Sequence, residues 1–333
     1  MKKTIFALAA LGTLAGTACA QSSVTIYGIV DAAITRTDNG TNTTTTLDSG
    51  KQSGSRIGFK GTEDLGEGLS VIFDMENGFN VDSGAQADSN RLFNRQAWIG
   101  LNGSFGTIKA GRQFTPVYAN LATIDPFGDA LAGDSARIFN TEYEGSRFDN
   151  DLTYHYEAGG IRSELQYSFG EVAGNSSAKR AIGGFAGYKN GPIDAVVTYT
   201  KVGNDAGTDD RRTWLIGGNY NFGVVKPYVA YATVKGKTGA ATADTDVRDW
   251  LLGLTAPAGT AGTVMASFAK KNNRAANNSD ARQWAIGYAH ALSKRTNLYT
   301  SYGRLSNDSA SALRVPVAGN TASEFNVGIR HLF

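Results

Sequence analysis

The sequence predicts an all-β protein, a closed barrel of sixteen antiparallel strands that crosses a membrane. Apolar and polar residues alternate with a period of two along most of the chain, the pattern of strands with one apolar face. Short and long links alternate strictly between these segments. With 41 glycines in 333 residues and a mean hydropathy of -0.25, the chain is too polar for a bundle of membrane-spanning helices.

The first segment has the layout of a secretory signal peptide. Two lysines precede an apolar stretch, and Ala18 and Ala20 place small side chains before a cleavage site ahead of Gln21. We expect residues 1–20 to be removed, which leaves residues 21–333 as one barrel domain.

Cleavage would also change the chemistry of the chain. Cys19 is the single cysteine of the sequence, so the mature chain would form no disulfide. A lipoprotein with Cys19 as the lipid-bearing residue is an alternative, but Gly16 stands where such sites usually have leucine. Loss of the two lysines leaves 30 basic and 30 acidic residues, which excludes the basic footprint of a nucleic-acid-binding protein.

The strands are expected to be long enough to cross a bilayer when tilted, which takes about 9 to 11 residues. Leu69, Val71 and Phe73, for example, share one face, while Ser70 and Asp74 share the other. The sixteen expected strands are Val24–Ile34, Ser55–Glu63, Gly68–Phe79, Arg91–Asn102, Gly106–Thr115, Asn150–Glu157, Ile161–Gly170, Lys179–Lys189, Pro192–Val202, Arg211–Phe222, Val224–Val234, Val247–Ala256, Thr263–Lys271, Ala281–Ala291, Thr296–Arg304 and Ala322–Phe333.

The links predict the orientation of the barrel. Short periplasmic turns and long extracellular loops, with an even strand number, are typical of outer-membrane barrels. The first and last strands can then pair and close the sheet. The short links are residues 64–67, 103–105, 158–160, 190–191, 223, 257–262 and 292–295; the long ones are 35–54, 80–90, 116–149, 171–178, 203–210, 235–246, 272–280 and 305–321.

The third long link is the longest and is expected to fold into the lumen. Sixteen strands enclose a water-filled lumen, and a link of this length inside a compact protein usually has a function. Folded inward, it would give the pore an acidic side through Asp125, Asp129, Asp134, Glu142 and Glu144.

Strand parity predicts a basic side opposite this link. If Ile57 and Phe59 face outward, Arg56 points into the lumen, and the same parity directs Lys109 and Arg147 inward. Parity is ambiguous for Arg95 because the apolar residues that follow it share its side. Opposed acidic and basic rows across a narrow, water-filled gap would orient polar solutes and separate anions from cations.

The chain resembles the trimeric general porins of Gram-negative bacteria, of the beta-proteobacterial and neisserial type. The segments that carry the resemblance span most of the mature chain: Ser23–Asp31, Ser55–Leu69, Asn94–Gln96, Phe105–Gln113, Asn219–Gly223, Ala289–Arg295 and Val327–Phe333.

The resemblance implies an outer-membrane homotrimer with loop three folded into each pore, opposite a basic cluster that matches Arg56, Arg95, Lys109 and Arg147. It implies passive diffusion of ions and small hydrophilic solutes with a preference for anions, and contact with outer-membrane lipid and lipopolysaccharide. Terminal Phe333 matches the aromatic end that the outer-membrane assembly machinery recognises. We expect no enzymatic activity, cofactor or metal, and no nucleic-acid partner.

Two other classes of protein are compatible with parts of the sequence. An outer-membrane barrel enzyme could use His155, His290 or His331 as a base, but none lies near a recognisable nucleophile motif. A soluble β-sandwich adhesin would have no reason to sort its links by length. Calcium binding at Asp209 and Asp210, or in residues 244–249, is less favoured than solvated loop carboxylates.

Overall fold

The computed structural model describes residues 23–139, 145–237 and 245–333. The expected signal peptide lies outside these ranges, as do Glu142 and Glu144 of the third long link. Within the described ranges, no helix is long and apolar enough to cross a bilayer.

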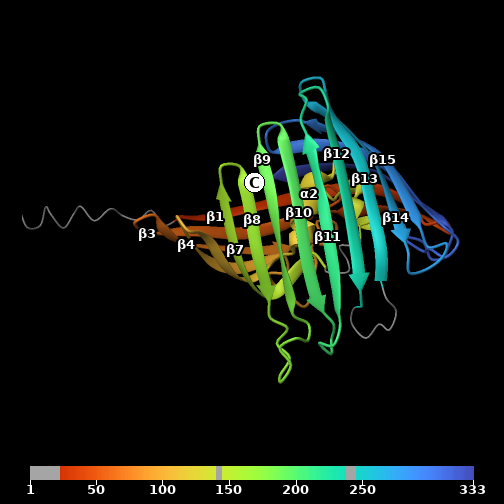
Figure 1. Ribbon diagram of the computed structural model, residues 1–333. Helices are drawn as coiled ribbons and strands as arrows, with labels where there is room; N and C mark the ends of the chain where they lie inside the picture. Colours follow the sequence, from red (N-terminus) through yellow and green to blue (C-terminus); the bar gives the residue numbers. More distant parts are fainter. Residues whose placement is uncertain (1–22, 140–144, 238–244) are drawn as a thin grey trace, which may run out of the picture.

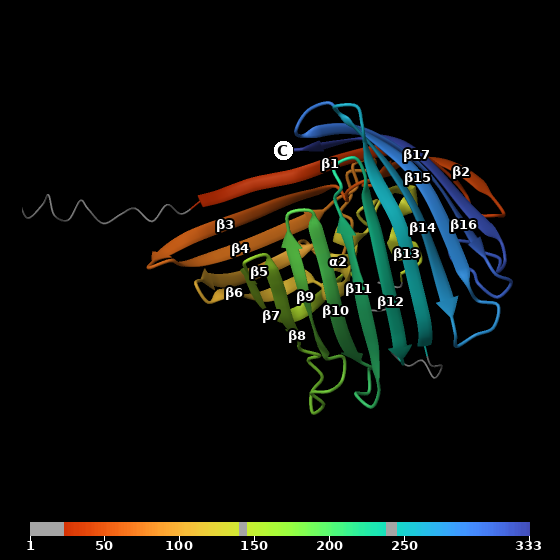
Figure 2. The ribbon, with the colours of Figure 1, turned by 45° about the horizontal axis from the view of Figure 1, so that its top comes forward.

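The strands form one closed antiparallel barrel, as predicted (Figures 1 and 2). The first strand pairs with the last, from Ile29 with Leu332 to Asp38 with Ser323, and this pairing closes the sheet. The strands are β1 (Ser23–Asp38), β2 (Thr43–Ser49), β3 (Arg56–Gly66), β4 (Leu69–Gly78), β5 (Gln96–Gly103), β6 (Gly106–Phe114), β7 (Arg147–Ala158), β8 (Ile161–Ser168), β9 (Ala181–Asn190), β10 (Ile193–Gly203), β11 (Asp210–Tyr220), β12 (Lys226–Gly236), β13 (Thr245–Ala258), β14 (Gly262–Asn273), β15 (Ala281–Ala291), β16 (Thr296–Asn307) and β17 (Thr321–Leu332).

The seventeen strands of the described residues occupy sixteen positions around the barrel. β2 pairs with the second half of β1 and β3 pairs with its first half, so β2 and β3 follow each other along one edge of β1. The expected long link at residues 35–54 is therefore wrong in part, because β1 continues to Asp38 and β2 lies within the link. The side chains of Asp38 and Asn39 accept hydrogen bonds from the Gly40 and Asn42 amides and so close the turn between β1 and β2. The threonines that begin β2 favour extended backbone.

One other expected strand begins too early. The sequence predicts a strand over Arg91–Asn102, but β5 begins only at Gln96. Arg91 instead binds Asp149 through Nη1, at 2.7 Å, across the loop that precedes β5. Asn94 accepts a hydrogen bond from the Gly78 amide, which holds this segment away from the sheet ladder.

The two faces of the wall differ as the alternation predicts. In β10, Asp194, Val196 and Thr198 are buried toward the lumen, whereas the residues between them are exposed. Apolar side chains on the outer face are largely exposed, for example Leu165 at 68%. A continuous exposed apolar band around a barrel is a lipid-contacting surface.

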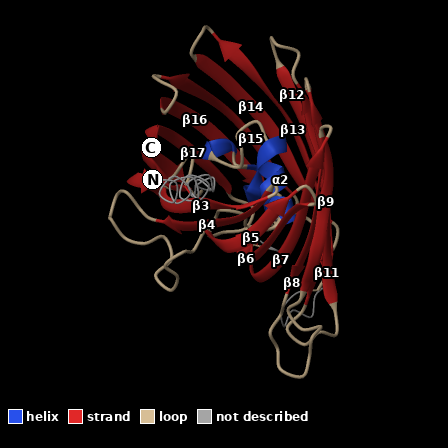
Figure 3. Ribbon diagram, turned by 90° about the vertical axis from the view of Figure 1, so that its left-hand side faces the viewer, coloured by secondary structure: helices blue, strands red, loops and turns tan. Residues whose placement is uncertain are grey.

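The link between β6 and β7 (residues 115–146) is called L3 below, and its described residues fold inside the barrel as predicted. It contains the helix α2 (Pro116–Ile124) and two short 3-10 helices, η1 (Leu131–Gly133) and η2 (Ser135–Arg137), which lie within the ring of strands (Figure 3). Thr115 caps α2 by accepting a hydrogen bond from the Tyr118 amide, and Pro116 suits the first helical turn.

L3 forms the hydrophobic core of the molecule by packing against the inner wall. Leu121 and Ile124 of α2 are fully buried, together with Leu215 of β11 and Leu251 of β13. Four wall glycines permit this close approach, namely Gly217, Gly253, Gly287 and Gly303. A β-carbon at Gly253 would lie 2.5 Å from Pro126 Cγ, and one at Gly303 would collide with the Ala132 carbonyl oxygen.

We therefore expect Gly303→Val to displace L3 from the wall. Overpacking of this kind costs about 1–3 kcal/mol, which the loop can relieve by moving into the lumen. Single-channel recordings in planar bilayers should show an altered conductance and weaker ion discrimination, with the barrel still folded. Ala266→Val, on the outer face of β14, is the control and should conduct like the parent. Unchanged conductance of Gly303→Val would contradict the packing described above.

Candidate pore constriction

A cavity of about 590 Å³ lies in the lumen between L3 and the wall formed by the first strands. Its charged lining combines five cations with four carboxylates. The cations are Lys51, Arg56, Arg95, Arg137 and Arg314, and the carboxylates are Asp48, Asp82, Asp129 and Asp134. The lining thus contains two of the predicted basic residues and two of the predicted acidic residues.

Arg56 and Arg95 are held on the wall by one shared carboxylate. Arg95 Nε lies 2.6 Å from Glu76 Oε1, and Arg56 Nη1 lies 3.5 Å from Glu76 Oε2. Arg56 also donates from Nε to the Gly54 carbonyl oxygen at 2.8 Å. Strand parity does not govern Arg95 because this residue precedes β5, which explains why the sequence pattern leaves its direction open.

Arg147, the first residue of β7, extends this basic group. Its Nε donates to the Arg95 carbonyl oxygen at 2.6 Å, so the two arginines lie side by side. Its guanidinium lies 4.7 Å from the ring centre of Phe114 and 5.7 Å from that of Tyr118 in α2. The aromatic rings keep the guanidinium in place without neutralising its charge.

Lys109 lies apart from the three arginines. It lines a second cavity of about 390 Å³, together with Trp98, His155 and Arg162. Its Nζ lies 3.9 Å from Glu164 Oε2 and 5.3 Å from the ring centre of Trp98. The structure thus brings together Arg56, Arg95 and Arg147 but not Lys109.

Among the described residues of L3, the carboxylates of Asp125, Asp129 and Asp134 accept hydrogen bonds largely from L3 itself. Asp125 is buried and accepts hydrogen bonds from the amides of Phe127, Asp129 and Ser135, at 2.9, 3.0 and 3.2 Å. Burial raises the pKa of Asp125 to about 6. Burial, followed by the neighbouring Asp134, raises the pKa of Asp129 well above its usual range.

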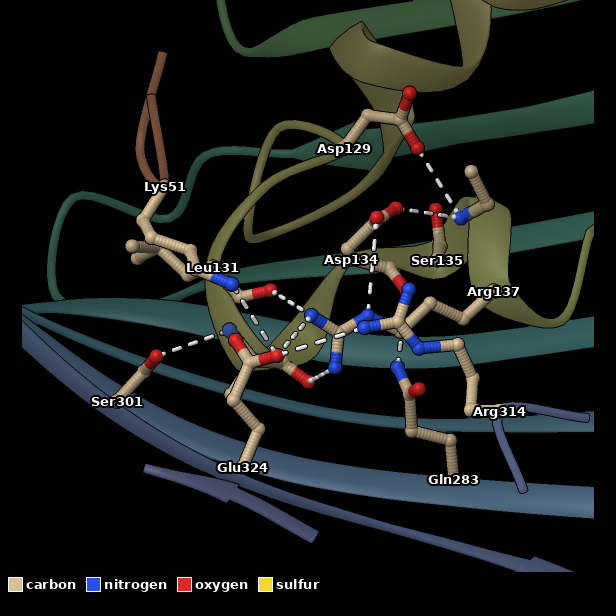
Figure 4. A network of polar contacts seen from close by, with 12 residues as sticks. Lys51, Asp129, Leu131, Asp134, Ser135, Arg137, Gln283, Ser301, Arg314 and Glu324 are labelled. Atoms are coloured by element: carbon tan, nitrogen blue, oxygen red, sulfur yellow. Dashed lines mark hydrogen bonds and ion pairs between the residues drawn. The ribbon is translucent and has the colours of Figure 1, made fainter. Parts of the chain in front are cut away.

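A polar network holds the tip of L3 on the opposite wall (Figure 4). Arg137 Nη2 donates to Glu324 Oε2 of β17 at 3.1 Å, and Ser301 Oγ of β16 accepts from the Ala132 amide at 3.0 Å. The segment that separates β2 from β3 takes part, since the Lys51 carbonyl oxygen accepts from the Leu131 amide at 2.8 Å. L3 is thus fixed on both sides of its tip.

Glu324 forms ion pairs with three cations from three parts of the chain. Besides Arg137, Lys51 Nζ lies 3.5 Å from Glu324 Oε2, and Arg314 Nη2, from the last long link, lies 3.7 Å from the same oxygen. One buried carboxylate therefore faces three positive charges at the edge of the cavity.

Sequence reasoning missed Lys51, Glu76, Arg137 and Arg314. Alternation in β4 places Glu76 on the polar face, but it gives no partner. Arg137 lies in a link whose expected role rests on its acidic residues, and Lys51 and Arg314 lie in links where no periodicity predicts direction. The four wall glycines opposite L3 would have been a further signal.

Phe333 is joined to the seam of the barrel. Its amide donates to the Gly28 carbonyl oxygen and its own backbone oxygen accepts from the Gly28 amide, both at 3.1 Å. Its ring lies over Gly28, where a β-carbon would collide with it. Across residues 23–139, 145–237 and 245–333, no group of three or more His, Cys, Asp or Glu residues is arranged to hold a metal ion.

Comparison with known proteins agrees with this geometry. A family model described as Gram-negative porin matches residues 7–310. Outer membrane porin protein 32 of Delftia acidovorans is 34% identical over 356 residues, which cover 100% of both chains. An outer membrane porin protein of Bordetella pertussis is 33% identical over 392 residues, again with 100% of both chains covered.

Solved structures share this barrel fold. An anion-selective porin from Comamonas acidovorans superposes with a TM-score of 0.83 at 32% identity, covering 94% of this chain and 100% of that one. OmpT of Vibrio cholerae in its trimer form shares the fold, with a TM-score of 0.72 at 16% identity over 94% of this chain and 99% of that one. The chain therefore belongs to the Gram-negative porin family and is an outer-membrane channel for passive diffusion.

Proposed function

We propose that this channel prefers anions and that the gap between L3 and the three wall arginines is its selectivity filter. The observation that carries the proposal is an imbalance of charge. Arg56 and Arg95 share one carboxylate, that of Glu76, and Arg147 lies against Arg95, while the carboxylate of Asp125 accepts hydrogen bonds from L3 amides. The similarity to a structure described as an anion-selective porin supports the same sign of preference.

The other predicted site residues complete the proposal. Asp129 and Asp134, which line the cavity, would provide the acidic side, together with Glu142 and Glu144. Asp134 is partly compensated by Arg137, whose Nε lies 3.8 Å from Asp134 Oδ2. Lys109 would act on solutes in its own cavity rather than at the gap.

We further propose that the chain works as a homotrimer and has no catalytic role. We propose as well that residues 1–20 are a cleaved signal peptide and that the assembly machinery recognises Phe333. The folded barrel would contact lipopolysaccharide in the outer membrane. Membership in a family of channels argues against the barrel enzyme named above.

Neutralising the wall arginines should shift selectivity toward cations. We expect Arg56→Gln with Arg95→Gln to lower the chloride-to-potassium permeability ratio about two- to tenfold, because two positive charges leave the filter and the carboxylate of Glu76 that they share loses both ion pairs. Reversal potentials across a salt gradient measure this ratio. The matched control, Lys294→Gln with Arg295→Gln, removes the same charge from an exposed turn. A ratio that falls equally in both variants would contradict the assigned filter.

Acidification should strengthen the anion preference. Protonation of Asp125, with a pKa of about 6, and of Asp129 removes negative charge from L3 while the arginines stay charged. The raised pKa of Asp125 also means that its contribution to stability is full below about pH 4 and is lost as the pH rises through about 6. We expect the permeability ratio for anions to rise between pH 7 and pH 5.

The double variant Asp125→Asn with Asp129→Asn isolates this effect, because asparagine keeps an oxygen acceptor without the charge. Its reversal potential should change little over the same pH interval. A variant that keeps the full pH response of the parent would assign the response to other groups.

A further inference from the structure

The second cavity of the lumen, of about 390 Å³, lies between α2 and the periplasmic end of the wall. Ala119 and Asn120 of α2 line it, as do Thr107 and His155, near the ends of β6 and β7 that adjoin short turns. Among the described residues, it shares no lining residue with the cavity at the constriction. Its volume is within the range of about 300–1,000 Å³ that is typical of small-molecule pockets.

Alternation in the strands directs aromatic and charged side chains into this cavity. In β5, Ile99 is exposed on the outer face, so Trp98 beside it faces the lumen. In β8, Leu165 is exposed on the outer face, so Glu164 faces the lumen. Glu164 pairs with Phe185 of β9 in the ladder, and the two side chains share the inner face.

Lys109 and Glu164 face each other in the cavity without forming a hydrogen bond. Lys109 Nζ lies 3.9 Å from Glu164 Oε2, and His155 Nδ1 lies 3.6 Å from the same oxygen. Both distances are longer than those of ordinary hydrogen bonds. The side chains of Lys109 and Glu164 are 22% and 12% exposed, so each keeps hydrogen-bonding capacity toward the cavity.

The arginine and the aspartate of the cavity are more firmly paired. Arg162 Nη2 lies 2.7 Å from Asp194 Oδ1, and Arg162 Nη1 donates to Asn120 Oδ1 of α2 at 3.2 Å. The carboxylate of Asp74 accepts a hydrogen bond from the Tyr27 hydroxyl at 2.8 Å. The loosely held lysine and glutamate are therefore the part of the lining that a solute can most easily engage.

Aromatic rings flank this loosely held pair. Lys109 Nζ lies 5.3 Å from the ring centre of Trp98, and the Arg162 guanidinium lies 5.7 Å from that of Phe185. Phe114, at the end of β6, lines the same cavity. Aromatic rings bind other rings in offset-stacked or edge-to-face geometry, so these side chains suit a solute that carries a planar apolar group.

We propose that this cavity is a subsite for zwitterionic amino acids with an aromatic side chain. Both charged groups of an α-amino acid are attached to one carbon atom, so its carboxylate reaches Lys109 while its ammonium reaches Glu164. An anion that lacks the ammonium would be repelled by Glu164. The aromatic ring of the solute would lie among Trp98, Phe114 and Phe185. This inference rests on the proposed action of Lys109 on solutes in its own cavity, and it does not require an anion preference at the gap.

Block of the ion current by small solutes tests the subsite in planar bilayers that hold the folded channel. We expect L-phenylalanine to reduce the single-channel current at about millimolar concentration. Three analogues each lack one group: hydrocinnamate lacks the ammonium, phenethylamine the carboxylate and L-alanine the ring. Each should need a concentration about fivefold or more higher for the same block. Equal block by hydrocinnamate would overturn the proposal, because the cavity would then be a simple anion site.

Two variants assign the block to the cavity. Trp98→Leu keeps an apolar side chain without the ring, and Lys109→Gln removes the charge. Each should raise the half-blocking concentration of L-phenylalanine about three- to tenfold, and ion conductance without the solute shows that each is folded.

The matched control is Lys226→Gln, because Lys226 also lies over an aromatic ring of the inner wall, 5.0 Å from the ring centre of Tyr228. This control should be blocked like the parent. Block that is unchanged in either cavity variant, or that falls equally in the control, would overturn the proposal.

The filter variant with Arg56→Gln and Arg95→Gln separates the subsite from the selectivity filter. It should keep the parental block by L-phenylalanine, whether or not its reversal potential changes. An unchanged reversal potential would count against the filter alone. Block that is lost in this variant and retained in Trp98→Leu would place the solute at the gap and overturn the subsite.

Discussion

The docking of L3 on the inner wall is the contact on which the channel depends. A sixteen-stranded barrel encloses a lumen wide enough to stay full of water, so the strands alone would form a pore that selects poorly among ions and solutes. Leu121 and Ile124 bury their side chains against the wall, and Arg137 reaches Glu324 on the far side of the lumen. Apolar packing and a charge-assisted hydrogen bond thus act at two ends of one loop, and together they set the width of the gap.

The same docking sets the electrostatics of the gap. With L3 in place, Tyr118 lies beside Arg147, and Arg147 lies against Arg95. Three like charges repel, at about 4 kcal/mol for a pair 4 Å apart near a protein surface. Glu76 and the rigid strands hold the three arginines together. Since one carboxylate neutralises only one of the three charges, a net positive charge faces the solute path. Since screening at physiological salt acts over about 8 Å, such a field controls a narrow gap but not a wide lumen.

Much of the fold could be predicted from the sequence because successive side chains of a barrel strand point alternately to the outer, apolar surroundings and to the water-filled lumen. That rule fails where the backbone leaves the ladder. The extension of β1 and the strand β2 do not follow from the sequence pattern, because a run of threonines and asparagines is typical of a polar loop. Threonine also has a high propensity for strands, and here the threonines pair with β1. Arg95 was ambiguous for the same reason, since it precedes the first residue of β5.

The site was predicted less completely than the wall. The direction of a side chain in L3 depends on how the loop folds, and Asp125 turned to its own amides because a buried loop must satisfy its backbone donors. Lys51, Arg137 and Arg314 converge on Glu324 from segments far apart in the sequence. The periodicity of any single segment cannot predict that these three cations contact Glu324.

The most direct measurement of L3 docking uses a disulfide between Ala132→Cys and Ser301→Cys. Ser301 Oγ lies 3.0 Å from the Ala132 amide nitrogen, so the two residues are in direct contact across the junction of L3 and β16. If L3 rests on the wall in the conducting channel, the bond forms in the folded protein, and oxidised and reduced channels show the same conductance and selectivity. Failure of the bond to form, or a change in conductance on oxidation, would contradict the account.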